Sequence, residues 1–174
     1  MTPSGTDVLR GEMVTLRLAA PEDAARLTEI LIIDGVALWW GRWDVDRVRR
    51  DLVSSADGAV AYVIEADGQV IGAIQYLEEN EPEYRHASVD IFLHPGWHRR
   101  GLGADAIRVL SRYLFTERGH HRLTIDPAAH NVAAIRSYGR VGFRPVGVMR
   151  LYERGRDGTW HDGLLMDLLA VELR

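Results

Sequence analysis

Apolar and polar positions alternate along the chain with two different periods, which predict strands and helices in turn. Segments with an apolar residue at every second position indicate half-buried strands, and segments with one at every third or fourth position indicate helices with a buried face. Strands are expected at 14–18, 60–65, 70–77, 87–93, 122–125, 146–153 and 160–169. Helices are expected from 21 to about 32, at 44–54, from 103 to about 119 and at 131–141.

The order of these elements predicts how they assemble. Strand, helix, helix, three strands, helix, strand, helix and two strands is the order of an α/β protein, in which a mixed sheet carries helices on both faces. The sequence contains no internal repeat, low-complexity segment or linker. One domain is therefore expected over residues 1–174.

The composition is that of a globular domain that folds without covalent cross-links. The 174 residues amount to 19.6 kDa, with 47% hydrophobic and 26% charged residues. A chain of this length buries roughly 70% of its unfolded surface. The absence of cysteine excludes disulfides, thiolate metal sites and a covalent cysteine mechanism. The histidines show no metal-ligand spacing, so no metal is expected.

The net charge and the absence of targeting signals indicate which ligands and which location to expect. The net charge of −4 argues against nucleic acid and favours a cationic small molecule. Residues 1–7 carry no basic segment followed by an apolar run, and the longest apolar stretches are far shorter than the ~20 residues of a membrane span. We expect a cytoplasmic protein without a membrane partner, either a monomer or a homodimer.

The most informative motif lies between the predicted strand at 87–93 and the long helix that follows. Residues 99–104, Arg-Arg-Gly-Leu-Gly-Ala, combine two glycines that allow a tight turn with the free N–H groups of a helix start. The two arginines add positive charge, so the loop suits a phosphate group. It lacks the lysine and hydroxyl residue of a Walker loop and the third glycine of the dinucleotide motif. The alternative is an ordinary glycine turn beside two solvated arginines.

Two motifs together resemble the GNAT superfamily of N-acetyltransferases. The first is the loop at 99–104, because strand, [Gln/Arg]-x-x-Gly-x-[Gly/Ala] and helix form the acyl-CoA loop of that family; His98 stands where Gln or Arg is usual. The second is 131–143, which is similar to the family pattern Asn-x-x-Ala-[Ile/Leu]-x-x-Tyr-x-x-x-Gly-Phe. The resemblance covers nearly the whole chain. It implies the GNAT fold, a twisted, mostly antiparallel sheet of about seven strands flanked by about four helices.

The resemblance also implies that acetyl-CoA is the cosubstrate. Its pyrophosphate would lie on the loop, its pantetheine arm would pair with a strand backbone, and a tyrosine would sit near its sulfur. The residues carried over for these roles are Ile91, Phe92, Leu93, Arg99, Arg100, Gly101, Leu102, Gly103, Ala104, Asn131, Ala134 and Tyr138. Tyr138 would protonate the leaving thiolate, whereas its helical spacing alone is typical of a core tyrosine.

Transfer to an amine requires a group that takes a proton from the attacking nitrogen. Asp90 is the best candidate, because it interrupts an apolar strand next to the expected acyl site, where a carboxylate must be paired, hydrated or protonated. The alternatives are that Asp90 lies on the solvent face of its strand or that His94 is the base. No covalent acyl-enzyme is required, so the absence of cysteine is no obstacle.

Four further pieces of the sequence bear on the acceptor: residues 39–41 (Trp-Trp-Gly), Gly72 with Gln75, residues 89–90 (Val-Asp) and residues 124–127 (Thr-Ile-Asp-Pro). Together with the two motifs above, they resemble one branch of the family, the aminoglycoside 6′-N-acetyltransferases of the Ib type. Trp39 and Trp40 lie in the region that forms the acceptor wall of this fold, and tryptophan faces attract cations. By analogy with that branch, Asp90 is the base. The aminosugar would then be held by Trp40, Gln75 and Asp126. The structural alternatives are two core tryptophans and an aspartate of a turn.

Three functions remain open at this point. The first is acetyl-CoA-dependent acetylation of a cationic small molecule, with the 6′-amine of an aminoglycoside antibiotic as the leading candidate and resistance as the consequence. The second is acetylation of a protein N-terminus, or of a polyamine or siderophore amine, by the same fold. The third is a non-catalytic acyl-CoA sensor, which the joint presence of Asp90 and Tyr138 disfavours.

Overall fold

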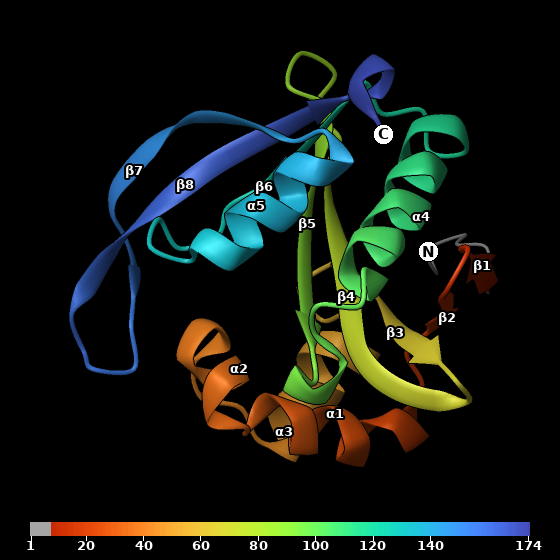
Figure 1. Ribbon diagram of the computed structural model, residues 1–174, viewed down its shortest axis with the longest axis vertical. Coiled ribbons are helices and arrows are strands. Elements are labelled where there is room, and N and C mark those ends of the chain that lie inside the picture. Colours follow the sequence, from red (N-terminus) through yellow and green to blue (C-terminus); the bar gives the residue numbers. More distant parts are fainter. Residues whose placement is uncertain (1–7) are drawn as a thin grey trace.

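A single sheet runs through residues 8–174, the part of the chain that the computed structural model describes, and helices cover both of its faces (Figure 1). The strands are β1 (Val8–Arg10), β2 (Thr15–Leu18), β3 (Val60–Ala66), β4 (Gln69–Glu79), β5 (His86–Leu93), β6 (Arg122–Ile125), β7 (Arg144–Arg154) and β8 (Trp160–Leu169). The helices are α1 (Ala24–Leu31), α2 (Asp34–Trp40), α3 (Val45–Arg47), α4 (Leu102–Thr116) and α5 (Val132–Val141). A π-helical segment, Val48–Val53, continues α3, and short 3₁₀ turns occupy Pro21–Asp23, Pro95–Trp97 and Ala170–Glu172.

The strand order in the sheet is β1-β2-β3-β4-β5-β6-β8-β7. Neighbouring strands are antiparallel except β5 and β6, which are parallel. This confirms the predicted mixed, mostly antiparallel sheet, with eight strands in residues 8–174 in place of about seven. The additional strand is β1, which pairs with β2 at the sheet edge and is only three residues long. A strand that short has no periodic pattern to detect.

The described residues also form five α-helices rather than about four, and α2 is the one that the pattern did not predict. The first helix was expected to end near residue 32 with no helix before 44, but Asp34 and Gly35 form the first turn of a new one. Asp34 places a negative charge at the start of α2, where the helix dipole favours it. The helix ends at Trp40, and Gly41, which caps it, has a φ of +74°. Seven residues are too few to establish a helical period.

Alternation along the central strands divides the apolar core into two layers. Tyr62 and Ile64 of β3 belong to the layer that contains the buried face of α4. Ala61 and Val63 belong to the layer that contains the buried residues of α1 and of the π-helical segment. Because successive strand residues point to opposite faces, each layer uses every second position of the same strand.

The feature that creates space for a site is the separation of β5 from β6. Their parallel pairing comprises Ala87 with Leu123 and Ser88 with Thr124, whereas β4 stays paired with β5 as far as Leu93. Beyond Ser88, the edge of β5 that faces β6 therefore has no strand partner among residues 8–174, and we call the region beside this edge the opening. Strand edges of this kind present backbone N–H and C=O groups that need partners.

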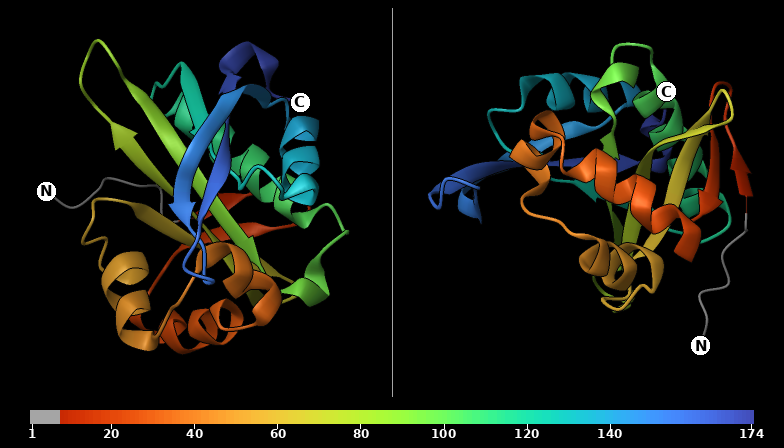
Figure 2. Two further views of the ribbon diagram at one scale, coloured as in Figure 1. Left: turned by 90° about the vertical axis from the view of Figure 1, so that its left-hand side faces the viewer. Right: turned by 90° about the horizontal axis from the view of Figure 1, so that it is seen from below.

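Strands β7 and β8 form a long hairpin that projects beyond the rest of the sheet (Figures 1 and 2). Val146, Val148 and Leu151 of β7 are exposed. The turn of the hairpin comes back to the body of the protein at α2, where Arg156 Nη1 lies 3.4 Å from Asp34 Oδ1. The hairpin and α2 therefore approach each other at one side of the opening.

The lengths and hydropathy of the helices bear on membrane association. Over residues 8–174 no helix is long and apolar enough to cross a membrane. Residues 1–7, on which the prediction of no signal peptide rests, lie outside the described part of the chain.

Candidate active site

The glycine loop has the backbone geometry of a phosphate cradle. Gly101 adopts a φ of +79° and caps the start of α4, and Arg99 adopts a φ of +63°. Left-handed residues interspersed in this way direct successive backbone N–H groups toward one side. Arg99 and Arg100 are exposed, and the Arg100 guanidinium lies 4.8 Å from the centre of the Trp97 ring. The loop therefore brings together a helix start, free N–H groups and two cations.

A buried carboxylate anchors the start of the helix that follows this loop. The Asp105 side chain accepts hydrogen bonds from the backbone N–H groups of Glu12 (3.3 Å), Met13 (2.7 Å) and Val14 (3.0 Å). These bonds attach the turn between β1 and β2 to the first turn of α4. Asp105 was not among the predicted site residues, and a buried carboxylate with several N–H donors is a stable structural element.

The free edge of β5 contains Ile91, Phe92 and Leu93, the residues expected to pair with the cofactor arm. Their side chains are occupied elsewhere: Phe92 packs in the α1 layer, and Ile91 and Leu93 pack in the α4 layer. The His98 ring nitrogen Nε2 lies 3.1 Å from the carbonyl oxygen of Leu93. Only the backbone of this strand edge is therefore available to an extended ligand.

Helix α5 begins beside the same opening. Asn131 is its N-cap residue, and Asn131 Oδ1 accepts the N–H of Ala134 at 3.2 Å. This bond satisfies one of the free N–H groups at the helix start. The side-chain amide NH₂ of Asn131 is the part left for a contact with a cofactor arm.

Asp90 stands on β5 opposite Gln75 of β4, and Gln75 Nε2 lies 3.4 Å from Asp90 Oδ2. Solvent reaches the carboxylate through the opening, yet protein atoms surround it on most sides, and this loss of hydration raises its pKa to about 6. The charges of Asp126 and Glu153 raise the pKa as well, whereas the hydrogen bond from Gln75 opposes the shift. Asp90 is thus both exposed and strongly perturbed.

Asp126 is the central charge of an acidic cluster that it forms with Asp90 and Glu153. Its Oδ2 accepts a hydrogen bond from the Tyr152 hydroxyl at 2.5 Å, which raises the pKa of Tyr152 to about 12. Burial raises the pKa of Asp90, Glu153 and Tyr138, and the charge of Asp126 raises each of the three further. Within residues 8–174, no group of three or more His, Cys, Asp or Glu side chains is arranged to hold a metal ion.

Tyr138 lies on α5 next to the acidic cluster. Its half-buried ring packs against the α4 layer, with its centre 6.4 Å from that of Phe143. Burial, followed by the charges of Asp90 and Asp126, raises the pKa of the hydroxyl above its ordinary value. The ring thus has the core environment that helical spacing predicts, while the hydroxyl interacts electrostatically with the proposed base.

The two adjacent tryptophans of α2 point in different directions. The Trp39 ring lies 5.0 Å from the His130 ring, which lies 5.6 Å from the His161 ring of β8. Trp40 instead packs against the α1 layer, edge-on to Phe92 at 4.8 Å. The structure therefore brings Trp39, and not Trp40, to the side where the hairpin approaches α2, because neighbouring helix residues point about 100° apart.

Sequence patterns indicated no role for four residues of this region: Tyr152, Glu153, His130 and His161. No motif contains them, and they follow Asp90 by 40 to 71 positions. One weak signal was present, since Glu153 is a charged residue at the end of a strand otherwise rich in apolar residues. Its direction could not be inferred, because β7 is irregular between Met149 and Glu153.

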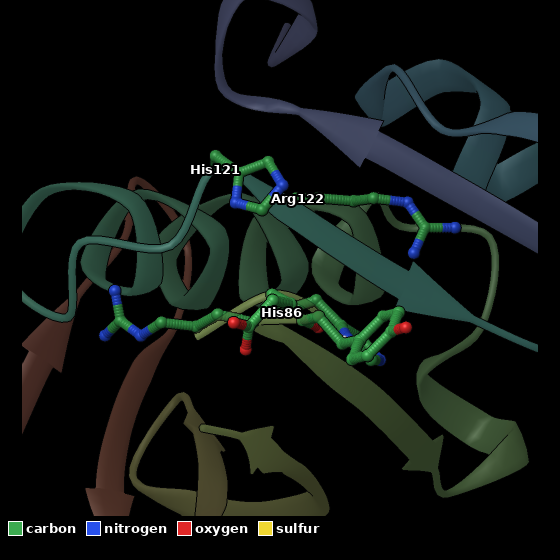
Figure 3. Close-up of a pocket in the computed structure, with 6 residues that line it drawn as sticks. His86, His121 and Arg122 are labelled. Atoms are coloured by element: carbon green, nitrogen blue, oxygen red, sulfur yellow. The ribbon is translucent and has the colours of Figure 1, made fainter. Parts of the chain in front are cut away.

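A hollow lies away from these residues, at the end of β5 and β6 where the two strands are paired (Figure 3). It is lined by Glu83, Tyr84, Arg85, His86, His121 and Arg122. Both arginines are engaged: Arg85 donates to the carbonyl oxygens of Arg118 and Gly119, and Arg122 pairs with Asp167 at 2.9 Å. This hollow does not contain the glycine loop, the free edge of β5 or the acidic cluster.

Known proteins with similar sequences and structures are acetyltransferases. Residues 26–143 match the family described as Acetyltransferase (GNAT) family. The aminoglycoside N(6′)-acetyltransferase type 1 of Klebsiella pneumoniae is 26% identical over 156 residues, which cover 79% of this chain and 77% of that protein. The putative ribosomal N-acetyltransferase YdaF of Bacillus subtilis (strain 168) is 28% identical over 176 residues, which cover 93% and 91%. The structure of aminoglycoside acetyltransferase AAC(6′)-Ib with coenzyme A and kanamycin has a TM-score of 0.75 at 26% identity and covers 91% of this chain and 96% of that one.

Proposed function

The chain belongs to the Acetyltransferase (GNAT) family, an N-acetyltransferase family that uses acetyl-CoA, and from this premise we propose that it acetylates a primary amine of a cationic small molecule. The leading acceptor is the 6′-amine of an aminoglycoside. The observation that carries the proposal is the cluster of Asp90, Asp126 and Glu153 beside Tyr138, at the open edge of β5.

The residues of the glycine loop and of β5 fit acetyl-CoA. The left-handed backbone at Arg99 and Gly101, the start of α4 and the exposed arginines suit a pyrophosphate group. The free edge of β5 suits the amide groups of a pantetheine arm, which can pair with it like a further strand. When bound, acetyl-CoA supplies a thioester that an amine can attack directly.

Asp90 is the proposed general base. An alkylammonium group has a pKa near 10, so the acceptor nitrogen reaches the site mostly protonated and must lose that proton. With a pKa of about 6, Asp90 is ionised at neutral pH and yet holds a proton more readily than an ordinary carboxylate. Both properties suit a base that takes this proton, so that the neutral nitrogen can attack the thioester carbon. As the C–N bond forms and the C–S bond breaks, the nitrogen loses its second proton, which replaces the one that the sulfur receives.

Tyr138 is proposed to give its proton to the departing sulfur. The charges of Asp90 and Asp126 help to keep that proton on the hydroxyl. Once Asp90 has received the proton of the amine, one of these charges is neutralised, and the pKa of Tyr138 falls. Proton transfer to Asp90 therefore prepares Tyr138 to act as an acid at the stage when the thiolate leaves.

The charge of the cluster favours an acceptor with more than one ammonium group. The charges of Asp126 and Glu153 raise the pKa of Asp90, and the charge of Asp126 raises the pKa of Glu153. A single cation would neutralise only part of the charge of these three carboxylates. The face of Trp39 adds a surface that attracts cations and packs against sugar rings. Aminoglycosides and polyamines carry several ammonium groups, whereas a peptide N-terminus carries one.

The relatives support two acceptor classes. The Klebsiella protein and the structure with kanamycin both carry the aminoglycoside in their names, at 26% identity. The Bacillus subtilis relative, named as a putative ribosomal N-acetyltransferase, aligns with 93% of this chain and favours a protein amine as the second candidate. Asp90 with its raised pKa disfavours the third candidate, a sensor without turnover, because such a module needs no base.

A panel of amines tests the proposal. The purified protein is incubated with acetyl-CoA and kanamycin, tobramycin, spermidine or a short peptide, and the released CoA is measured with a thiol-reactive dye. The chain contains no cysteine, so it contributes no background. We expect release with the aminoglycosides. Release only with peptide or spermidine would exclude the aminoglycoside acceptor, and saturable acetyl-CoA binding without release would favour the sensor.

A further inference from the structure

We infer that Tyr152 is a positioning residue of the acceptor site: a bulge in β7 sets its hydroxyl on Asp126 and so fixes the carboxylate at the centre of the acidic cluster. The inference rests on the proposed function for the class of ligand, an amine with several positive charges. It concerns a residue outside both motifs that indicate the family.

The bulge is visible in the register of the last hairpin. Met149 of β7 pairs with Gly163 of β8, and Glu153 pairs with His161. Three residues of β7 therefore lie opposite one residue of β8, Asp162. Bulges of this kind bend a strand and redirect its side chains, and they are common next to functional sites.

Asp162 holds the bulge in place. Its Oδ1 accepts the N–H of Leu151 at 2.8 Å, and Leu151 has a φ of +49°, a left-handed conformation that is uncommon for leucine. The backbone carbonyl of Asp162 accepts the N–H of Ala129 at 2.8 Å, in the segment that follows Asp126. One residue of β8 thus connects the bulge that carries Tyr152 to the segment that carries Asp126.

The neighbouring glycine makes room for the tyrosine ring. A Cβ atom at Gly163 would lie 2.8 Å from Tyr152 Cδ1, so a larger residue there would displace the ring. Tyr152 is 48% exposed, so burial of its ring does not account for the strained backbone before it. What the arrangement achieves is the 2.5 Å hydrogen bond from the Tyr152 hydroxyl to Asp126 Oδ2.

That hydrogen bond holds the Asp126 carboxylate, whose charge affects the pKa of its neighbours. Asp126 influences the pKa of Asp90, Tyr138, Tyr152 and Glu153. Without the Tyr152 hydroxyl, the Asp126 carboxylate is free to rotate, and an arriving ammonium group must order it. The expected effect is weaker binding of the acceptor, with little change in the chemical step.

Removal of the hydroxyl alone tests this role. For Tyr152→Phe, the Kd for kanamycin and spermidine is measured by calorimetry without acetyl-CoA, and KM and kcat are measured for any amine that is acetylated. We expect the Kd and KM of the amine to rise about tenfold, as for the loss of one hydrogen bond to a charged group. We expect kcat and the KM of acetyl-CoA to stay within about twofold. Tyr84→Phe, at a tyrosine that is 74% exposed, is the matched control and should change nothing.

Two variants of Asp162 test the bulge. Asp162→Asn keeps an oxygen that can accept the Leu151 N–H and should bind amines like the wild type. Asp162→Ala removes that acceptor and should reproduce the loss seen in Tyr152→Phe. If Asp162→Ala does not fold, Tyr152→Phe decides alone, since it keeps the ring and its packing.

Each outcome has a defined meaning. Unchanged amine binding in Tyr152→Phe, or an equal loss in acetyl-CoA affinity, overturns the inference. Amine binding by the wild type without CoA release overturns the proposed transfer to those amines, while the comparison of Kd values still decides the role of Tyr152. Binding of neither kanamycin nor spermidine by the wild type means that the cluster is no site for such amines, and it overturns the inference.

Discussion

The two halves of the site are built in different ways. The cofactor half comprises the glycine loop and the free edge of β5, and it is held by backbone hydrogen bonds, including the three that Asp105 accepts. The acceptor half comprises Trp39, the acidic cluster and the β7–β8 hairpin, and it joins segments that are far apart in the sequence.

The clearest difference between the two halves is how well the charges of their carboxylates are compensated. In the cofactor half the buried carboxylate of Asp105 is satisfied by N–H donors. In the acceptor half Asp90 and Glu153 have raised pKa values, because burial and like charges oppose their ionisation. The buried charge of the cofactor half is therefore compensated by the protein itself, whereas the acceptor half has an excess of negative charge that a cation would relieve. Groups perturbed in this way are frequent at catalytic sites.

The largest expected effect is a loss of turnover without a loss of acetyl-CoA binding, which would show that the two halves have separate functions. Asp90→Asn removes the proposed base while keeping the size of the side chain, so turnover should fall by about 10²- to 10⁴-fold. Acetyl-CoA affinity should stay unchanged, because the glycine loop and the β5 backbone are not altered. CoA release and acetyl-CoA binding, measured on the same preparation, check both statements.

The control for that variant is Asp67→Asn. Asp67 lies in the turn between β3 and β4 with a φ of +49°, a conformation that asparagine tolerates well. It should turn over like the wild type. Substantial activity in Asp90→Asn would show that a water chain or another group removes the proton, and the functional contrast between the halves would be lost.

The same contrast explains how much the sequence could predict. Periodicity located the longer helices and the central strands well. The helix expected at 131–141 is Val132–Val141, and the strand expected at 122–125 is Arg122–Ile125. Periodicity failed for β1 and α2, which have three and seven residues, because so few residues cannot establish a period. The candidate residues of the cofactor half were found together because most lie in two contiguous motifs, although their role in binding stays a prediction.

The acceptor half was harder to predict because tertiary structure brings it together. Asp90, Gln75 and Asp126 were named in advance, but Trp40 was placed at the acceptor wall, and it packs in the α1 layer instead. The Tyr152 side chain points toward Asp126 because of the bulge in β7. Strand alternation cannot predict which face a side chain lies on when a bulge adds residues to the strand. No pattern in the sequence marks that bulge.

The paired tryptophans offer the next test of the comparison. Trp40→Ala should lower the free energy of unfolding by about 2–3 kcal/mol, somewhat less than for a fully buried ring, because Trp40 is half-buried against Phe92. Trp39→Ala should lower it by less than about 1 kcal/mol and instead raise the KM of a cationic amine by about three- to tenfold. Urea unfolding and steady-state kinetics on both variants check this, and each variant is the control for the other. Equal losses of stability would mean that both rings are core residues.

A matched pair of glycines tests the cofactor half. Gly101 has a φ of +79° in the loop, and Gly68 has a φ of +72° in the turn between β3 and β4. Alanine at either position should cost about 1–2 kcal/mol of stability, since a Cβ disfavours the left-handed region. Only Gly101→Ala should also raise the KM of acetyl-CoA, by about tenfold if about 1.4 kcal/mol of binding is lost. The KM of the amine should stay the same in both variants, and a shift in it would argue that the halves are coupled.

The pH dependence of kcat/KM tests the charge of the acceptor half. Because Asp90 must be ionised to accept a proton and has a pKa of about 6, kcat/KM should fall about tenfold between pH 7 and pH 5 on this account alone. Asp126→Asn removes one cause of the raised pKa, so the midpoint of that fall should move to lower pH. It should stay above the ordinary value for an aspartate, because burial, the larger cause, remains. A midpoint that stays in place would mean that another group controls the acid limb.

The smallest effect concerns stability. The pKa of Asp90 is raised above its ordinary value of 3.8, so folding disfavours the charged form. The cost appears as pH rises from about 4 to 6 and persists above it. Asp90→Asn should therefore be more stable than the wild type at pH 7, by under about 1 kcal/mol because solvent reaches the carboxylate, and equal to it near pH 4. Urea unfolding at both pH values checks the sign. A variant less stable at pH 7 would mean that the Asp90 charge is satisfied in the free protein, as the charge of Asp105 is in the cofactor half, and the electrostatic contrast between the halves would be lost.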